Sequence, residues 1–300
     1  MSVDGILNIN KPSGLTSFQV VARVRRATRI KRVGHGGALD PMATGVLPVC
    51  IGRGTRVAEF FLLSPKTYRA EVELGIVTDT FDAEGAVVQR SDPSFVGRED
   101  LLKILPSLMG WTEQTPPMYS AVRYQGKHLY ELARAGIDVI RQPRMVHVTR
   151  LELLDFKSPR FTLEVDCGKG TYVRSLAHDL GQKLGCGATL KSLVRLRCSS
   201  FTLANAVSLS DFEDAVRRQD WLPLVHPLDS VLSSLQRVDV DQPTRLRIEQ
   251  GQPVNLDPSS QAEVLRAYSP DNHFIAILRF EKDSGLWHPE KVFLETGPLG

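Results

Sequence analysis

The spacing of apolar residues predicts helices in two segments of the chain. In residues 16–27, three valines recur on one helical face and three arginines lie mostly off that face. Thr16 and Gln19 have the spacing of a capping box at the start of this segment. Residues 176–184 form the second helical pattern, and Gly185 follows as the expected C-cap. We therefore expect the first helix to bury its valines and expose its arginines.

Strand-like alternation appears in several further segments. Apolar and polar residues alternate in residues 68–74, 144–154 and 161–165, as in half-buried strands, and residues 46–51 resemble a short buried strand. Strands and helices follow one another without a regular βαβ rhythm. The pattern therefore predicts an α+β fold, with a mixed, mainly antiparallel sheet flanked by helices.

The chain is expected to form a large domain and a small one. Residues 90–110 resemble a linker with a short helix inside the large domain. Pro223 and Pro227 mark the region where the large domain ends, so we assign residues 1–230 to it. Residues 235–300 hold short strand-like runs split by a Pro-Asp-Asn turn, which predicts a small β module.

Composition narrows the class of protein. The 300 residues, 42% of them hydrophobic and 24% charged, can bury a large core and argue against long disordered stretches. The four cysteines form no CxxC pair and have no histidine at ligand spacing, so we expect reduced thiols rather than a disulfide frame or a zinc site. The N-terminus does not resemble a signal peptide, and no stretch approaches about 18 uninterrupted apolar residues. We expect a cytoplasmic protein without membrane contact.

Positive charge is concentrated in two tracts. Residues 5–39 carry seven Lys or Arg residues and no acid, and residues 169–197 carry six against the single acid Asp179. Such an imbalance suits a surface that binds a polyanion, because each cation near a phosphate releases counterions. For either tract alone, a solvated helix face that happens to be basic is the alternative.

The densest candidate for chemistry is the glycine-rich segment 34–49, GHGGALDPMATGVLPV. Its glycines allow the backbone to approach a ligand closely, and Pro41 biases Asp40 away from helix. A tight loop therefore presents Asp40 five residues after His35, although composition alone also fits an ordinary turn. The segment lacks the Gly-Lys-Ser/Thr ending of a P-loop. Residues 79–85 have the wrong spacing for a calcium loop and predict a turn that joins two strands.

In these segments the sequence resembles the TruB-type tRNA pseudouridine synthases, a family that modifies uridine 55 in the T-loop of tRNA. The likeness covers about residues 5–210. It rests on motifs at residues 11–17 (KPSGLTS), 34–49, 66–69 (KTYR), 78–82 (TDTFD), 114–121 (QTPPMYSA) and 169–176 (KGTYVRSL). The chain departs from the family at 199–201, where Ser-Ser-Phe replaces the frequent Gly-Pro-Phe, and at Ala38, where many relatives have Thr.

The resemblance implies roles for individual residues. It makes Asp40 the essential aspartate, able to act as a covalent nucleophile in a cofactor-free isomerisation. Arg174 is the arginine expected to pair with Asp40 and lower its pKa, with a phosphate contact as the alternative. Tyr68 is expected to stack on the target base and is the candidate to remove the C5 proton. Tyr172 and Leu193 are expected to line the uracil pocket.

The resemblance also implies how RNA is bound. The target uridine is buried in a folded loop, so the enzyme must flip it out, and His35 is expected to contact the RNA there rather than act as a general base. Residues 115–145 match a family insertion that closes over the T-loop, with tyrosines and basic residues suited to stacking and phosphate contact. Residues 235–300 are similar to a PUA-like domain expected to touch the acceptor end. The implied protein is a monomer that binds tRNA, not DNA, and needs no metal, cofactor or protein partner.

Two other functions would use some of the same features. A catalytically idle RNA-binding protein or RNA chaperone would need the basic tracts, but not Asp40, Tyr68 and Arg174 together. A synthase that works within a guide-RNA complex is disfavoured by the compact length and the intact insertion. The sequence leaves open whether Asp40 attacks the uracil ring, attacks the sugar carbon or abstracts a sugar proton.

Overall fold

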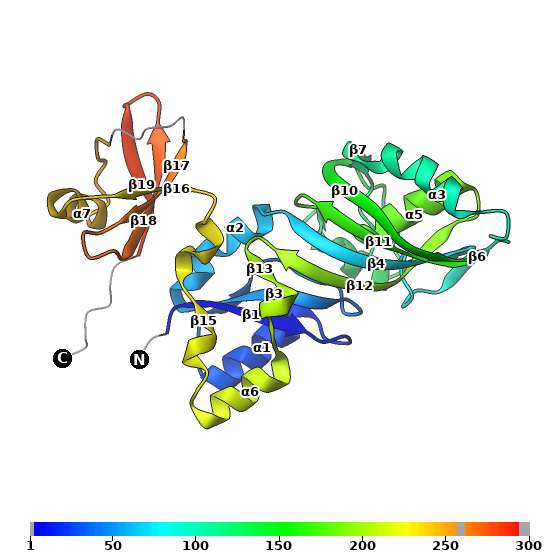
Figure 1. Ribbon diagram of the computed structural model, residues 1–300, viewed down its shortest axis with the longest axis horizontal. Coiled ribbons are helices and arrows are strands. Elements are labelled where there is room, and N and C mark those ends of the chain that lie inside the picture. The colour runs from blue at the N-terminus through cyan, green and yellow to red at the C-terminus, as the bar shows by residue number, and fades with distance from the viewer. Residues whose placement is uncertain (1–2, 257–261, 294–300) are drawn as a thin grey trace.

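The computed structural model describes residues 3–256 and 262–293, and its main feature is a large sheet (Figure 1). Eleven strands of the described residues join this sheet. The main path is β14 (Val207–Ser208), β1 (Gly5–Lys11), β3 (Thr44–Ile51), β12 (Ala188–Cys198), β4 (Lys66–Leu74), β11 (Arg160–Cys167), β10 (Arg144–Lys157) and β7 (Gly110–Gln114), with β13 (Phe201–Thr202), β15 (Val225–His226) and β2 (Val33–His35) paired beside it. Most pairs are antiparallel, whereas β12–β3 and β1–β14 are parallel. The predicted α+β fold with a mixed, mainly antiparallel sheet is confirmed.

Two groups of helices pack against different parts of the large sheet (Figure 1). α5 (Val173–Leu184) packs on β12 and β4, and α3 (Arg98–Ile104) lies beside α5. α1 (Ser17–Thr28) and α6 (Leu209–Arg218) pack together next to β1 and β2. The sheet is therefore flanked by helices at both of its ends.

The two predicted helices follow their sequence patterns. Thr16 caps α1, and Gln19 completes the capping box. The three valines of α1 are buried against β1 and β3, while Arg25 and Arg26 are exposed. α5 ends before Gly185, whose φ of +79° lies in the left-handed region that favours glycine. Amphipathic spacing and end signals located α1 and the end of α5, whereas α5 begins at Val173, three residues before the predicted start.

The strands beneath α5 have one apolar and one charged face. On β4, Ala70, Val72 and Leu74 are buried in the core that α5 covers. The residues between them point to the opposite face and form ion pairs with neighbouring strands. Because successive side chains of a strand alternate between faces, the helix-covered side of this sheet is the dry side.

Several small elements lie outside the large sheet. β5 (Ile76–Thr78) and β6 (Val87–Arg90) form a hairpin, which confirms the predicted strand-joining turn at 79–85. Between β7 and β10 lie a second hairpin, β8 (Arg123–Tyr124) with β9 (Lys127–His128), and α4 (Leu129–Arg134). α2 (Ala58–Leu63) directly precedes β4.

A separate sheet forms the C-terminal unit (Figure 1). Its strands are ordered β16 (Gln236–Asp239), β17 (Val264–Tyr268), β18 (Phe274–Glu281) and β19 (Leu286–Val292), and α7 (Gln242–Glu249) contacts β18 and β19. Ile277 and Phe293 of this unit share a hydrophobic cluster with Phe61 of α2. The predicted β-rich C-terminal unit is confirmed, while residues 257–261 and 294–300 of the predicted module lie outside the described residues.

The described residues also bear on membrane helices, disulfide bonds and metal sites. No helix among them is long and apolar enough to cross a membrane. All four cysteines are buried and free, as expected from their spacing. No group of three or more His, Cys, Asp or Glu side chains in the described ranges could hold a metal ion.

Candidate active site

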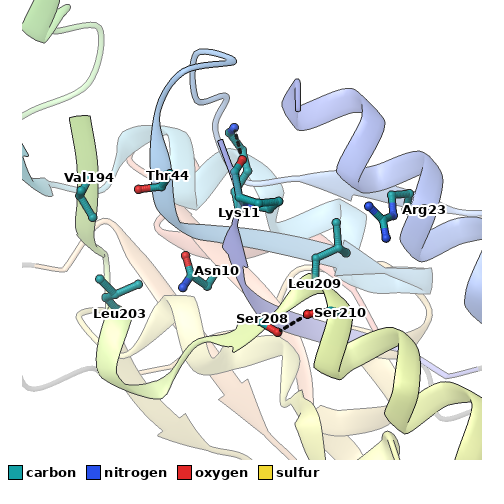
Figure 2. Close-up of a pocket in the computed structure, with 10 residues that line it drawn as sticks. Asn10, Lys11, Arg23, Thr44, Val194, Leu203, Ser208, Leu209 and Ser210 are labelled. Atoms are coloured by element: carbon teal, nitrogen blue, oxygen red, sulfur yellow. Dashed lines mark hydrogen bonds between the residues drawn. The ribbon is translucent and has the colours of Figure 1, made fainter. Parts of the chain in front are cut away.

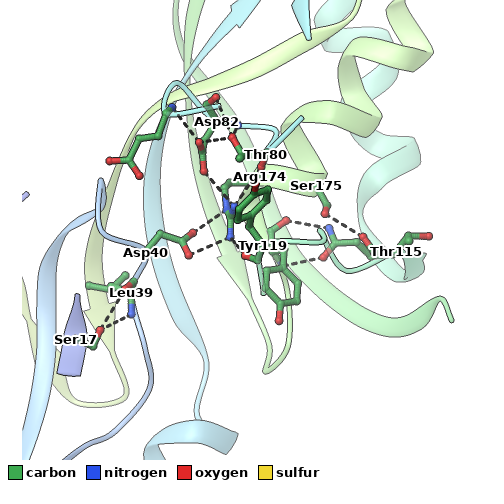
Figure 3. Close-up of polar contacts among 12 residues, drawn as sticks. Ser17, Leu39, Asp40, Thr80, Asp82, Thr115, Tyr119, Arg174 and Ser175 are labelled. Carbon is green, nitrogen blue, oxygen red and sulfur yellow. Dashed lines mark hydrogen bonds and ion pairs between the residues drawn. The ribbon is translucent and has the colours of Figure 1, made fainter. Parts of the chain in front are cut away.

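Asp40 lies in the loop between β2 and β3, and the N-terminal motif holds this loop in place (Figure 3). The Lys11 ammonium donates a hydrogen bond to the Pro41 carbonyl at 3.0 Å. The Ser17 hydroxyl accepts from the Leu39 N–H at 2.8 Å and donates to the Leu39 carbonyl at 3.2 Å. The motif therefore fixes the backbone on both sides of Asp40, which explains why these residue types occur together.

Arg195 holds the same loop from β12. Its guanidinium donates to the carbonyls of Gly37 at 3.1 Å, Ala38 at 3.3 Å and Val46 at 2.6 Å, and the residue is 1% exposed. Close contact is possible because Gly45, with a φ of +102°, has no Cβ, and a Cβ there would lie 2.3 Å from the Arg195 carbonyl. The buried arginine therefore places the loop backbone.

Arg174, in the first turn of α5, connects Asp40 to a second carboxylate (Figure 3). Its Nε lies 2.8 Å from Asp40 Oδ2, and its Nη2 donates to Asp40 Oδ1 at 3.0 Å. Nη1 donates to Asp82 Oδ2 at 3.1 Å and to the Thr80 carbonyl at 3.2 Å. Nη2 also donates to the Tyr119 carbonyl at 3.0 Å. One buried guanidinium is thus held by several acceptors while it contacts both oxygens of Asp40.

The charge of Asp40 is set by competing effects. Its side chain is 34% exposed, whereas that of Arg174 is 4% exposed. Desolvation raises the pKa of Asp40, the Asp82 carboxylate pushes that pKa further up, and Arg174 and Lys11 oppose the rise. Arg174 lowers the pKa of Asp40 as expected, but burial outweighs the guanidinium, so the net direction is upward. The side-on contact is still the geometry of an ionised carboxylate.

Burial corrects the interpretation of the two basic tracts. Lys11, Arg174 and Arg195 are at most 3% exposed, and Arg23 pairs with Glu213. The three buried cations bind the protein's own carbonyls and carboxylates and are not part of an exposed phosphate-binding surface, whereas the Arg23 side chain is 41% exposed beside Glu213. The exposed cations of the first tract are Arg25, Arg26, Arg29, Lys31 and Arg32.

Tyr68 and Leu193 lie in the core beside the Asp40 loop. Both belong to the hydrophobic cluster that contains Leu39 and Ala43, and Tyr68 is 9% exposed. Burial raises the pKa of Tyr68 to about 12, so its phenol is neutral at neutral pH in the free protein. The structure thus brings these two residues to the apolar wall next to the loop.

Tyr172 and His35 are half-buried. The backbone of Tyr172 is fixed just before α5, because its N–H donates to Gln114 Oε1 at 2.7 Å and its carbonyl accepts from Gln114 Nε2 at 3.1 Å. His35 Nδ1 accepts from the Gly37 N–H at 3.3 Å. Desolvation lowers the pKa of His35, which favours a neutral ring.

Asp82 is the site residue whose function the sequence reasoning missed. The segment 79–85 was interpreted as a turn, but Asp82 is 4% exposed and points to Arg174. Its Oδ1 accepts from the Thr80 hydroxyl at 2.6 Å and from the Glu84 N–H at 3.0 Å. The TDTFD motif at residues 78–82, with two threonines and two aspartates, was the available signal.

An open pocket of about 540 Å³ lies apart from Asp40, between β1 and the start of α6 (Figure 2). Four polar side chains on its wall are already paired: Arg23 binds Glu213, the Ser208 and Ser210 hydroxyls bind each other, and the Lys11 ammonium binds backbone carbonyls. Asp40 is the stronger candidate for an active site, because its partly exposed carboxylate pairs with the buried guanidinium of Arg174.

Comparison with known proteins gives consistent matches. The model of the TruB family pseudouridylate synthase (N terminal domain) matches residues 25–173, and that of the tRNA pseudouridylate synthase B C-terminal domain matches residues 174–235. The tRNA pseudouridine synthase B of Dehalococcoides mccartyi (strain CBDB1) is 48% identical, over 99% of this chain and 98% of that protein. That of Clostridium tetani is 38% identical, over 90% and 93%. A solved structure of a Cbf5-Nop10-Gar1 complex shares the fold, with a TM-score of 0.76 at 24% identity over 97% of this chain and 85% of that chain.

Proposed function

Because the chain belongs to the TruB family of pseudouridylate synthases and is a tRNA pseudouridine synthase, we propose that its target is uridine 55 in the T-loop of tRNA. The observation that carries the catalytic part of the proposal is the side-on pairing of a partly exposed Asp40 with the buried Arg174. A carboxylate fixed in this way is a suitable nucleophile, because it is oriented before substrate binds.

The reaction involves no net oxidation and no hydrolysis. The N1–C1′ bond of uridine breaks, the base rotates, and a C5–C1′ bond forms. C5 loses a proton and N1 gains one, so the product is an isomer of the substrate. Asp40 enters as an ionised carboxylate and is regenerated at the end, whether it attacks the ring, attacks the sugar carbon or abstracts a sugar proton. The proposal therefore assigns no cofactor or metal.

Tyr68, Tyr172 and Leu193 form the proposed uracil pocket beside Asp40. Tyr68 and Leu193 supply apolar surface from the core, and Tyr172 directly precedes α5, two residues before Arg174. With a pKa of about 12, Tyr68 is a neutral phenol that can stack on the base. It accepts the C5 proton only if substrate binding lowers that pKa.

The proposed RNA-binding surface surrounds this pocket. The segment 115–143 reaches the site through the Tyr119 carbonyl, which accepts from Arg174. Tyr124 is 38% exposed within this segment and is available to stack on RNA. His35 contacts the flipped-out nucleotide, since extrusion of a base needs compensating contacts. The C-terminal unit, as a PUA-like domain, binds the acceptor end, and the protein acts as a cytoplasmic monomer on tRNA rather than DNA.

The proposal is tested with an unmodified tRNA transcript and the position of each pseudouridine in the product. Product should appear at the T-loop uridine and at no other site. A matched transcript with cytidine at that position should bind equally well and yield no pseudouridine. Product at a different uridine would contradict the target assignment, and tight binding without any product would leave the RNA chaperone function in its place.

A further inference from the structure

A ring stack joins the turn that carries Asp82 to helix α5. The rings of Phe81 and His178 lie nearly parallel, at an interplanar angle of 18° and a centroid distance of 3.9 Å. Phe81 directly precedes Asp82, and His178 lies one helical turn after Arg174. Burial lowers the pKa of His178, so the ring stacks as a neutral aromatic group. The same face of α5 therefore holds both the arginine and the ring.

The backbone at Phe81 adopts a conformation that such a residue rarely has. Its φ is +64°, in the left-handed region that is unfavourable for bulky side chains. The Phe81 N–H donates to the Thr78 carbonyl at 3.2 Å, and its carbonyl accepts from the Leu190 N–H at 3.0 Å. A conformation of this kind persists only where surrounding contacts enforce it, and the stack on His178 is one of these contacts.

The residues on both sides of Phe81 bind Arg174. The Thr80 carbonyl and the Asp82 carboxylate accept from the same nitrogen, Nη1, at 3.2 Å and 3.1 Å. A displacement of the turn would therefore move both acceptors away from Arg174 together. The same guanidinium contacts both oxygens of Asp40. A shift of the turn that moves this planar group would therefore also change the orientation of the Asp40 carboxylate.

We propose that Phe81 and His178 are a positioning pair for the catalytic carboxylate. Their stack holds the turn 79–85 against α5. The turn, once held there, keeps the Arg174 guanidinium in contact with Asp40. The inference rests on the proposed function, since it requires Asp40 to be the reacting group. The pair acts through Arg174 and not through contact with the RNA.

Four variants separate the stack from its surroundings. Phe81→Asn removes the ring but tolerates the left-handed backbone, so it does not add strain. His178→Ala removes the other ring, whereas His178→Phe keeps an aromatic partner. His147→Ala is the matched control, because it removes a histidine that stacks on Trp111, at 4.6 Å and 10°, on strands β10 and β7.

The readouts are the single-turnover rate of pseudouridine formation at saturating transcript and the Kd for that transcript. Phe81→Asn and His178→Ala should slow the reaction about fivefold to tenfold, with unchanged Kd, as expected for loss of an aromatic pair. His178→Phe and His147→Ala should stay within about twofold of wild type. In an Asp82→Asn background, Phe81→Asn should slow the reaction by a smaller factor than it does alone, because Asp82 is one of the two acceptors through which the stack acts.

Three results would overturn the inference: wild-type rates in Phe81→Asn and His178→Ala, equal slowing in His178→Phe and His178→Ala, or a full additional loss in the Asp82→Asn background. A failure of the proposed function is distinguished by the wild-type protein in the same assay. Wild type without product removes the premise, whereas active wild type with equally active stack variants sinks the positioning role alone.

Discussion

Two buried arginines hold the Asp40 loop, and they differ in the groups that they bind. Arg195, on β12, donates to backbone carbonyls of the loop and of β3. Arg174, on α5, contacts the carboxylates of Asp40 and Asp82. Arg195 therefore places the backbone, whereas Arg174 orients the Asp40 carboxylate and influences its charge.

The comparison shows that a buried cation does not require an acid as partner. The five N–H donors of a guanidinium can be offset by carbonyl dipoles, which stabilise the charge without a second ion. At Arg174 two acids share one cation, so the surplus negative charge adds to burial in raising the pKa of Asp40. The carbonyl contacts of Arg195 therefore fix the position of the loop, and the carboxylate contacts of Arg174 act on the orientation and charge of Asp40.

The largest effect is expected from Arg174→Lys, which removes the guanidinium contacts to the carboxylates of Asp40 and Asp82. An ammonium keeps the charge but cannot contact both oxygens of Asp40 and also reach Asp82. The single-turnover rate of the folded protein at saturating transcript should fall about 100-fold, or roughly 2.7 kcal/mol. A near wild-type rate would contradict the assigned role of Arg174.

Arg195→Lys should disrupt the hydrogen bonds to the loop carbonyls and mainly reduce the stability of the fold. A lysine cannot reach the three carbonyls together, so buried acceptors lose their donors. The free energy of unfolding, measured by denaturant titration, should fall by about 3 kcal/mol. The folded fraction should react faster than Arg174→Lys does. If Arg195→Lys is as stable as wild type, the arginine does not hold the loop.

The pH dependence of the rate sharpens the contrast. The ionised form of Asp40 is needed, so the rate should fall as pH drops through its raised pKa, above the ordinary carboxyl value of about 3.9. Asp82→Asn removes a charge that raises this pKa, so the acidic limb should move to lower pH even as the plateau rate decreases. A limb that does not move would show that Asp82 is not electrostatically coupled to Asp40.

The smallest effect on the rate is expected from residues that contact neither Arg174 nor Arg195. Arg25→Glu combined with Arg26→Glu reverses charge on the exposed part of the first basic tract. Transcript affinity should weaken and its salt dependence should flatten, while the saturating rate stays at the wild-type value. Arg217→Glu with Arg218→Glu, on α6, is a charge-matched control. An unchanged salt slope would exclude Arg25 and Arg26 from the RNA-binding surface.

Local patterns in the sequence were enough for the elements that carry the site. The capping box and valine stripe located α1, and Gly185 marked the end of α5. The pairing of Asp40 with Arg174 was implied by the family resemblance, and the structure has them in contact. The helices depend on neighbours in the chain, so local sequence carries them, whereas the pair was found only through the resemblance.

Features that depend on distant contacts could not be predicted in this way. Lys11 and Arg195 counted as surface charge because a linear tract does not show that loop carbonyls will surround them. The sequence shows Asp82 only as a turn residue, because its contact with Arg174 forms only when α5 packs against that turn. The order of strands, with β12 between β3 and β4, likewise results from pairing between residues far apart in sequence.

The central claim is that the ionised carboxylate of Asp40 carries the reaction, and Asp40→Asn tests it most directly. Asparagine preserves the size of the side chain but cannot ionise. The measurement is single-turnover pseudouridine formation at saturating transcript, together with the Kd. The account predicts conversion of the T-loop uridine by wild type, and no product from Asp40→Asn at wild-type affinity. An Asp40→Asn protein that still converts this uridine at a comparable rate would contradict the account.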